Sequence, residues 1–340
     1  MIRGLAIDED DAVRTRALST MLGSQRLRGQ RDMLGALGAV ALMTPAGVKR
    51  RTIYNAQKQA DLPGALVRGE GGPKIKDRMA NEAYEHSGTV YDFFSKVYGR
   101  KSIDDRGMRL DSTVHYREDP SEAFDNAFWN GTQMIYGDGG KSFHRFTKCL
   151  DVIAHELTHG ITQYEAGLGY HGQSGALNES FSDVFGSLVK QWKKKQTAAK
   201  ADWLIGKGLF EKKVNGIALR SLKKPGSAYD EPLFGGKDPQ PHHMKHYVNL
   251  ADTRAGDNGG VHINSGIPNH AFYLVAIELG GRAWERAGRI WYDALCNRIR
   301  SDSTFESAAK ATIASATSLY GSNSKEAKAV KSAWKKVGVL

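Results

Sequence analysis

The sequence predicts an α+β fold of two lobes, one rich in β-strands and one α-helical, preceded by a short leader. With 340 residues, the chain exceeds the usual size of one domain. Short β-prone runs separated by turns dominate from residue 52 onward. Helical periodicity dominates beyond residue 170. We therefore expect a leader at 1–51, a β-rich N-terminal lobe at 52–170 and an α-helical C-terminal lobe at 171–340.

The leader ends where the composition changes, at the basic triplet of residues 49–51. Residues 12–31 are polar and rich in arginine, and they predict a helix. The glycine- and alanine-rich stretch 33–47 is suited to being a connector that proteases cut. The N-terminus carries four consecutive acids at 8–11, whereas a secretory signal needs a basic start and an unbroken apolar run. We therefore expect no Sec-type signal peptide.

The first lobe alternates strand-and-turn patterns with two helices. A helix is expected near 74–99, and a second at about 149–167. The strand-and-turn patterns lie at 51–57, 64–72, 112–118 and 133–140. In the second lobe, helices are expected at 175–195, 264–280, 281–299, 303–319 and 324–336.

The composition argues against several classes of protein. An apolar share of 40% is enough for a globular core, and no run approaches the ~20 apolar residues of a membrane span. The two cysteines, Cys149 and Cys296, cannot form a disulfide framework. The net charge of +11 could suit nucleic acid, but the basic residues are spread along the chain without aromatic interleaving. We expect a solvated basic surface, with neither nucleic acid nor a membrane as partner.

Two histidines in the sequence suggest a metal site. His155 and His159 lie four residues apart with Glu156 between them, so both imidazoles share one face of the expected helix. Two ligands do not hold a catalytic zinc ion, and a third is required. The longer motif HExxHxxGxxH is excluded because Thr162 stands at its glycine position. The next expected helix supplies a carboxylate instead, Glu179, 20 residues after His159.

The same helix offers a second carboxylate, Asp183, four residues after Glu179. A zinc-bound histidine normally donates its other ring N–H to a carboxylate, and Asp183 suits that role. Two histidines and one glutamate leave the fourth zinc position open for water, as in a catalytic site. We expect zinc to lower the pKa of that water and Glu156 to act as its general base.

Four blocks, at 126–139, 151–170, 175–186 and 257–273, together resemble the thermolysin family of zinc metallopeptidases in order and spacing. The resemblance covers about residues 52–340. It implies a thermolysin-like zincin fold with the active-site cleft between two lobes, and a zinc-dependent endopeptidase. The leader resembles the short propeptide of the protealysin-like branch, which implies a zymogen.

The resemblance also implies roles for particular residues. His155, His159 and Glu179 would bind zinc, and Glu156 would activate the water. His262 and Tyr170 would hydrogen-bond the oxyanion, since fixed donors at a developing charge are worth a few kcal/mol. Asp257 would orient His262. Asn126 and the main chain of Ala127 would hold the substrate backbone. Arg220 would bind the substrate carbonyl beyond the cut.

The pocket for the residue after the cut is implied to be apolar, which selects a bulky apolar side chain by burial. Some of its residues would also pack in the core. The implied lining residues are Phe143, Phe146, Val152, Ile205 and Leu219.

The chain departs from the family pattern at the positions where family members bind calcium. Lys190, Leu204 and Lys207 stand where the resemblance expects acids. A hard cation needs six or more oxygens, and a lysine ammonium repels it. We therefore expect no double calcium site, with Asp151 and Asp202 pairing with Lys190 instead.

The sequence therefore predicts a zinc endopeptidase that acts on proteins and peptides, with its own propeptide as an intramolecular inhibitor and a monomeric state. Two other functions stay open: a zinc-bearing binding protein that no longer cleaves peptides, and a basic nucleic-acid binder. We expect a secreted enzyme that acts outside the cell after export without a Sec signal, with a cytoplasmic location as the alternative. Activation could come from self-cleavage or from a trypsin-like enzyme at the triplet 49–51.

Overall fold

The computed structural model describes residues 1–36 and 48–340. They form two compact units. The first comprises Met1–Gly160, Gly206–Leu219 and Tyr229–Lys237, and the second comprises Ile161–Ile205, Arg220–Ala228 and Asp238–Leu340. Most of the glycine- and alanine-rich connector expected from the sequence, residues 37–47, lies outside the described residues.

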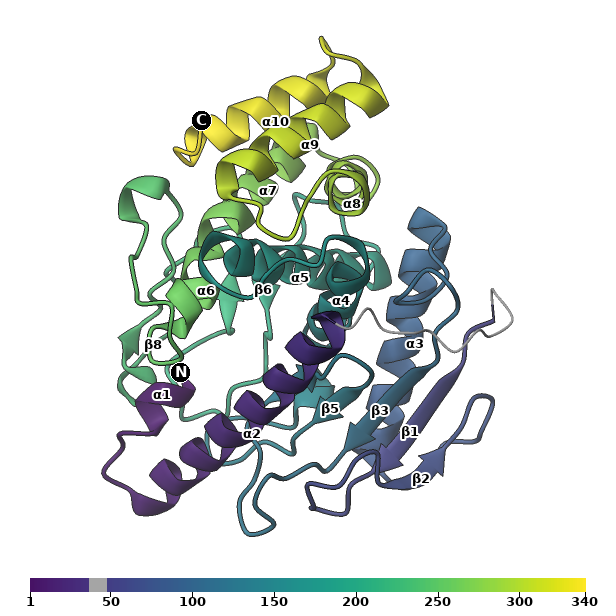
Figure 1. The fold of residues 1–340 in the computed structure, drawn as a ribbon, viewed down its shortest axis with the longest axis vertical. Helices are drawn as coiled ribbons and strands as arrows, with labels where there is room; N and C mark the ends of the chain where they lie inside the picture. Colours follow the sequence, from purple (N-terminus) through teal and green to yellow (C-terminus); the bar gives the residue numbers. More distant parts are fainter. Residues whose placement is uncertain (37–47) are drawn as a thin grey trace. The chain divides into compact units, whose positions relative to one another are not determined.

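A five-stranded sheet, in the order β2-β1-β3-β5-β4, is the centre of the first unit (Figure 1). Its strands are β1 (Arg51–Asn55), β2 (Ala65–Arg68), β3 (Leu110–Val114), β4 (Ala127–Trp129) and β5 (Met134–Tyr136). The β1–β3 and β3–β5 pairs are parallel, and the β1–β2 and β4–β5 pairs are antiparallel. β4 therefore lies at an edge, with a neighbour on one side only among the described strands.

Helix α3 (Arg78–Tyr98) covers β1 and β3 with an apolar face. It begins where the Asp77 carboxylate accepts the amide hydrogen of Ala80 at 3.2 Å. It ends at Gly99, whose φ of +75° is a left-handed conformation that terminates helices. Its buried residues include Val90 and Phe93, neither of which exposes any surface. The helix confirms the one expected near 74–99.

The leader folds as two helices of the first unit, α1 (Ile2–Leu5) and α2 (Asp11–Ala36). α2 contains the helix expected at 12–31 and continues beyond it. The Asp10 carboxylate caps its start by accepting the amide hydrogen of Ala12 at 2.9 Å. α2 packs against β4, where Leu27 is fully buried. The core cluster around Leu27 contains Ala56, Tyr116, Phe124, Phe128 and Ile135.

Helix α4 (Leu150–Glu165) begins in the first unit and ends in the second. It confirms the helix expected at about 149–167 and follows the short 3₁₀ helix η1 (Phe146–Lys148). Gly160 lets its neighbours approach closely, since a Cβ there would lie 2.6 Å from a methyl carbon of Ile103. The remaining elements of the first unit are β8 (Asp230–Glu231), η2 (Pro232–Phe234) and β9 (Gly236–Lys237).

The second unit is helical. After the end of α4 it contains α5 (Gly172–Lys193), α6 (Asp257–Asn264), α7 (Gly266–Leu279), α8 (Ala287–Asn297), α9 (Phe305–Tyr320) and α10 (Lys325–Lys336). Its short elements are β6 (Leu204–Ile205), β7 (Arg220–Ser221) and η3 (Met244–His246). α6 packs on α5, and α10 packs on α7 and α9. No helix among residues 1–36 and 48–340 is long and apolar enough to cross a membrane.

Candidate active site

The two motif histidines project from the same side of α4 and are almost completely buried. His155 is 5% exposed and His159 is 4% exposed. Their Nε2 atoms lie 3.1 Å apart, and the two rings are nearly perpendicular, with centroids 4.7 Å apart. The four-residue spacing of a helix thus aims both imidazole nitrogens at one point.

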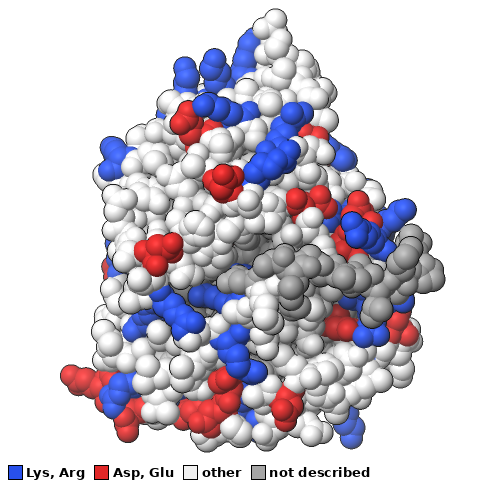
Figure 2. Space-filling view, viewed as in Figure 1, with Lys and Arg blue, Asp and Glu red and all other residues white. Residues whose placement is uncertain are grey.

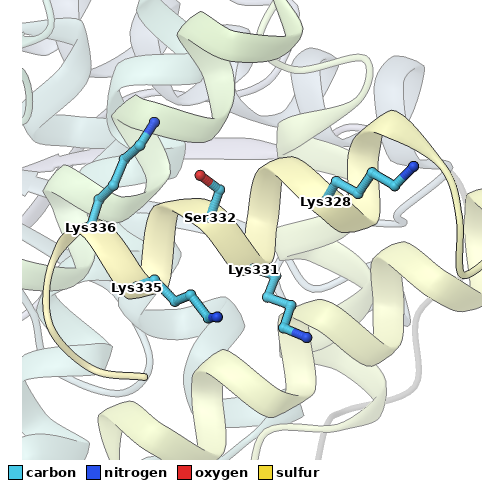
Figure 3. A pocket seen from close by; sticks show the side chains of 5 residues that line it. All are labelled: Lys328, Lys331, Ser332, Lys335 and Lys336. Carbon is cyan, nitrogen blue, oxygen red and sulfur yellow. The ribbon is translucent and has the colours of Figure 1, made fainter.

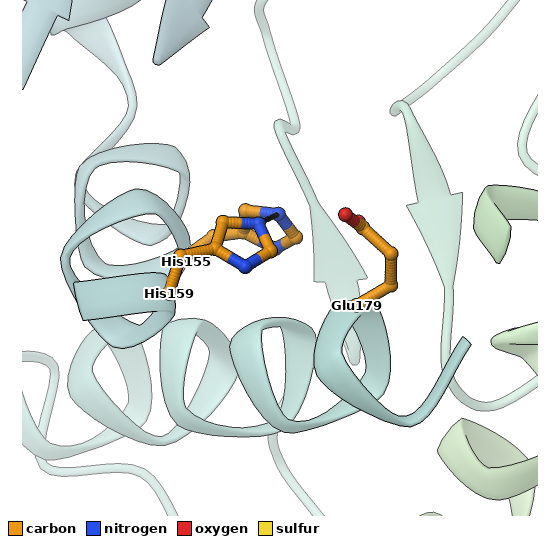
Figure 4. A group of neighbouring side chains, drawn as sticks. All are labelled: His155, His159 and Glu179. Atoms are coloured by element: carbon orange, nitrogen blue, oxygen red, sulfur yellow. Dashed lines mark hydrogen bonds between the residues drawn. The ribbon is translucent and has the colours of Figure 1, made fainter. Parts of the chain in front are cut away.

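Glu179, on α5, completes a group of three potential metal ligands (Figure 4). One ligand atom from each of His155, His159 and Glu179 lies within 4.8 Å of the other two, and all three residues are buried. Two imidazoles and one carboxylate are a donor set typical of catalytic zinc. The residues present therefore fit a zinc ion.

Glu156 is fixed beside these ligands by the sheet. Its Oε2 atom accepts the backbone amide hydrogen of Trp129, in β4, at 3.2 Å. Its Oε1 atom lies 3.9 Å from Nε2 of His155. The carboxylate is thus held next to the ligands by a backbone group, without being one of the three.

Tyr170 and His262 lie side by side near Glu179. The Tyr170 hydroxyl donates to Oε1 of Glu179 and lies 3.1 Å from Nε2 of His262. Asp257 contacts His262 twice. Its Oδ1 lies 2.7 Å from the ring Nδ1, and its Oδ2 accepts the His262 backbone amide hydrogen at 2.9 Å. Burial by itself would raise the pKa of Asp257, but His262 holds that pKa below its usual value.

A left-handed turn explains how α6 delivers His262 to this place. Asn258, Gly259 and Gly260 have φ angles of +49°, +79° and +78°, a region in which glycine is unstrained. The turn returns the chain so that Asp257 reaches His262 within one short element. The sequence predicted no helix here, because its helical pattern began at 264.

Asp183 is completely buried on α5 and receives a bidentate contact from Arg220. The Arg220 Nε and Nη2 atoms each donate to one carboxylate oxygen at 2.7 Å. Asn269, on α7, donates its side-chain amide to the same carboxylate at 2.9 Å. Asn269 belongs to the block at 257–273 but is not among the site residues that the sequence predicts. Asp183 therefore fixes the guanidinium of Arg220.

Asn126 and Ala127 lie at the start of the edge strand β4. The Asn126 Oδ1 atom accepts the amide hydrogen of Ala127 at 2.9 Å. The Asn126 Nδ2 group donates to the hydroxyl of Ser24, in α2, at 2.9 Å. A leader residue therefore occupies the side chain that the family resemblance assigns to substrate binding.

Two family models match the chain. The model of the thermolysin metallopeptidase catalytic domain matches residues 46–163, and the model of the thermolysin metallopeptidase alpha-helical domain matches residues 166–339. The chain belongs to the thermolysin family of metallopeptidases.

Individual members of the thermolysin family resemble the chain over most of its length. An extracellular metalloprotease of Pectobacterium carotovorum subsp. carotovorum is 54% identical over 87% of this chain and 82% of its own length. Protease PrtS of a Photorhabdus strain is 48% identical over 85% of this chain and 76% of its own length. Thermolysin of Alicyclobacillus acidocaldarius subsp. acidocaldarius is 38% identical over 84% of this chain but only 50% of its own length.

A solved structure of the family resembles the whole chain, leader included. The precursor of protealysin, a metalloproteinase from Serratia proteamaculans, has a TM-score of 0.88, 47% sequence identity, and coverage of 100% of this chain and 97% of that one. This thermolysin-family member is therefore a zinc-dependent endopeptidase made as a zymogen, and its substrates are peptides. The predicted two-lobe α+β fold is confirmed.

Four of the five pocket residues implied by the resemblance lie in the first unit of this thermolysin-family fold: Phe143, Phe146, Val152 and Leu219. The first three are at most 5% exposed, whereas Leu219 is half-buried. Phe143 stacks on Phe234 with centroids 5.4 Å apart, so part of this set is also core. Ile205, in the second unit, is fully buried.

A buried lysine lies in the region where the family resemblance expects calcium. Lys190, in α5, is 7% exposed, and its Nζ lies 3.0 Å from Oδ1 of Asp202 and donates to the carbonyl of Leu204. The Asp151 carboxylate accepts the amide hydrogens of Val152 at 3.0 Å and Gly206 at 3.2 Å. These contacts give each of the three side chains a partner within the protein.

A hollow of about 340 Å³ on α10 has the wrong chemistry for the active site of this thermolysin-family enzyme (Figure 3). Its lining consists of Lys328, Lys331, Ser332, Lys335 and Lys336. Amines and one hydroxyl offer neither a zinc donor set nor an apolar pocket. On the face in Figure 2, acidic side chains lie among the basic ones over this region. We interpret the hollow as a solvated helix face.

Proposed function

We propose that the enzyme cleaves peptide bonds on the amino side of bulky apolar residues, with His155, His159 and Glu179 as zinc ligands and Glu156 as general base. The observation that carries this proposal is the buried His-His-Glu group with Glu156 fixed beside it by the Trp129 amide. Zinc bound there would act as a Lewis acid and lower the pKa of a water molecule. Glu156 takes the proton of that water and later delivers it to the leaving amine.

Tyr170 and His262 stabilise the charge that develops on the substrate carbonyl oxygen. Their polar atoms lie 3.1 Å apart, so both can reach the same oxygen. Asp257 fixes the ring of His262 through Nδ1 and thereby leaves Nε2 for the substrate. Donors fixed in advance need no reorganisation during the reaction, which is why they favour the transition state.

The substrate backbone binds along β4. This strand is at the edge of the sheet, and an extended peptide can add to such an edge through main-chain hydrogen bonds. Asn126 and the main chain of Ala127 hold the peptide there. Arg220, oriented by Asp183, donates to the substrate carbonyl beyond the cut.

The specificity comes from apolar surface in the first unit. Phe143, Phe146, Val152 and Leu219 offer aromatic and aliphatic carbon. Burial of a Leu or Phe side chain is worth about 25 cal/mol per Å², which disfavours small or charged residues after the cut. Leu219 is the member of the set with substantial exposed surface and is the residue that contacts the substrate side chain.

The leader inhibits the enzyme by occupying the substrate-binding strand. Ser24 binds Asn126, and α2 packs on β4 through Leu27. The contact through Leu27 is apolar. The contact with Asn126 is polar. A tethered segment has a high effective concentration, so contacts of modest strength can suppress activity.

The proposal also covers calcium, the oligomeric state and the location of the enzyme. The enzyme binds no calcium near α5, because Lys190 supplies a positive charge there. It works as a monomer, since one chain supplies every residue assigned above. It acts outside the cell, as does the relative named an extracellular metalloprotease.

Peptide cleavage with and without a zinc chelator tests the function. The peptides differ only in the residue after the cut, which is Leu, Phe, Ala or Asp. We expect the activated enzyme to cleave the Leu and Phe peptides fastest, and to stop when zinc is removed and resume when it is restored. Equal rates for Leu and Asp would refute the specificity, and full activity without metal would refute the zinc mechanism.

A further inference from the structure

The leader helix places two arginines on acidic residues of the catalytic part of the first unit. Arg26 contacts the carboxylate of Glu118, with Nη2 to Oε2 at 3.1 Å, and also donates to the hydroxyl of Tyr116 at 2.5 Å. Arg16 lies 3.3 Å from Oε2 of Glu122, and both of these side chains are less than a fifth exposed. The Arg26–Glu118 contact is a charge-assisted hydrogen bond, the stronger class, whereas Arg16 and Glu122 form an ion pair.

A third acid, Asp125, is buried beneath the same face of α2. Its backbone amide donates to the Thr20 hydroxyl at 3.0 Å, and the residue is 4% exposed. Its Oδ1 atom is buried and has no hydrogen-bond partner in the described part of the chain. A buried carboxyl oxygen in that state leaves hydrogen-bonding capacity unused, so the site can accept a donor that the leader does not supply.

These contacts adjoin the residue to which we assign the substrate backbone. Arg16, Thr20 and Ser24 recur every four residues and so share one face of α2. Ser24 lies on Asn126, the neighbour of Asp125 in the chain. The leader therefore presents cationic side chains to an acidic surface while it occupies a substrate-binding side chain.

We propose that Glu118, Glu122 and Asp125 form an acidic subsite that binds Lys or Arg side chains of the peptide substrate once the leader has left. The inference rests on the proposed function, because it assigns a further preference to the same substrate path. In the precursor, the leader arginines occupy this subsite. In the processed enzyme the three carboxylates recruit substrates with a basic residue at a distance from the cut.

The preference arises because the three carboxylates form a local negative charge on a protein whose net charge is positive. The chain as a whole carries +11, and residues 52–340 keep a net +7 because the leader holds nine Arg or Lys and five acids. The processed enzyme therefore repels basic peptides except where acidic side chains are concentrated. A basic substrate residue replaces the guanidinium that the leader withdraws, and it gains charge-assisted hydrogen bonds. Such a contact is partly exposed, so we expect a gain in kcat/KM of about threefold to tenfold that added salt reduces.

The test uses enzyme obtained by processing the full chain. A peptide series keeps one scissile bond and places Lys, Gln or Glu at each of several positions on both sides. We expect Lys to raise kcat/KM over Gln at one or two positions, and Glu to lower it. In Glu118→Gln, Glu122→Gln and Asp125→Asn the Lys-to-Gln ratio should fall toward one.

A ratio cancels any general loss of activity or of folded enzyme. Glu306→Gln is the matched control, because it removes an exposed acid of α9 that pairs with Lys310, and it should keep the wild-type ratio. If Asp125→Asn does not fold, the two glutamate variants decide the question. A wild-type enzyme that cleaves the Gln peptides but shows no Lys preference would overturn this inference alone. Cleavage of none of the peptides would overturn the proposed function instead.

Discussion

A backbone amide of the sheet contacts Glu156, the proposed general base. Trp129 belongs to β4 and donates its amide hydrogen to Glu156 at 3.2 Å. The contact couples the position of the carboxylate to the strand along which we place the substrate. Displacement of β4 would therefore disturb substrate binding and catalysis together.

The substitution Glu156→Gln separates these two roles. Glutamine can still accept the Trp129 amide hydrogen, but it cannot take a proton from water. We expect kcat to fall about a hundredfold to ten-thousandfold, with zinc content unchanged because the three ligands are intact. Activity on peptides and metal analysis of the same sample measure both quantities. A variant with wild-type kcat would remove Glu156 from the role of base.

Among the elements, α5 carries the proposed metal ligand Glu179 in its first half and Lys190 near its C-terminal end. Lys190 places an ammonium group on Asp202 and the Leu204 carbonyl. A positive charge fixed by the chain itself cannot be removed by a chelator. The stability of this region should therefore not depend on the calcium concentration.

We predict that a calcium chelator that spares zinc leaves the melting temperature unchanged. Lys190→Met should lower the free energy of unfolding by about 1–3 kcal/mol, because it removes the ammonium group that contacts the Asp202 carboxylate and the Leu204 carbonyl. Thermal unfolding with and without chelator measures both effects. Lys193→Met, at an exposed position of the same helix, is the control and should change little. A large loss of stability on chelation, restored by calcium, would contradict the assignment.

The docking of α2 should depend on pH through Asp125. Burial raises the pKa of Asp125 to about 7, although Arg16 lowers it in part; Glu122 raises it further. The docked leader thus favours the neutral acid, whereas a solvated Asp has a pKa near 4. The contribution of Asp125 to docking is most favourable below about pH 4 and weakens as pH rises toward 7, by up to roughly 4 kcal/mol.

Amide exchange of α2 in the full chain measures this dependence between pH 5 and 8, after correction for intrinsic exchange. Protection of α2 should fall as pH rises in the wild type and stay level in Asp125→Asn. The Arg16–Glu122 and Arg26–Glu118 pairs need ionised carboxylates, so they cannot produce a loss on going to neutral pH. An unchanged pH dependence in Asp125→Asn would exclude this carboxyl as its source.

For the whole molecule, the position of Arg51 limits where the leader can be cut. Arg51 is 8% exposed, opens the interior strand β1 and pairs with Glu70. Lys49 pairs with Asp92 at 2.9 Å. A protease that cuts beyond Arg51 would have to open the sheet first. The processed chain should therefore begin no later than Arg51.

N-terminal sequencing of the purified chain over time tests this limit, alongside the Glu156→Gln chain. We expect no peptidase activity before processing, and slower processing in the variant if the enzyme activates itself. Processing at the normal rate in Glu156→Gln would assign activation to another protease. Full activity with the leader attached would refute inhibition by the leader, and a new N-terminus beyond Arg51 would refute the structural limit.

Patterns with a regular period were predictable from the sequence, and single contacts were not. Helices α3, α4, α9 and α10 lie close to their expected ranges, because each has an apolar face of helical period. The helix expected at 281–299 begins only at Ala287, since Gly280 and Gly281 have positive φ and delay it. Strand β4 has only three residues, too few for an alternating pattern.

In the candidate site, too, some residues could be predicted from the sequence and some contacts could not. The grouping of His155, His159 and Glu179 could be inferred, because helix spacing and zinc chemistry constrain those residues strongly. The contacts of Asn269 with Asp183 and of Ser24 with Asn126 join residues 86 and 102 positions apart. Local periodicity carries no information on such pairs, so only the folded chain reveals them.

The edge position of β4 has a consequence for the biosynthesis of the protein. A strand with one open side can pair with the same strand of another unfinished molecule, which is a common route to aggregation. The leader is translated before β4 and packs against it in the folded precursor. We therefore expect the leader to shield this strand while the chain folds, so that its removal follows folding, when the rest of the sheet is complete.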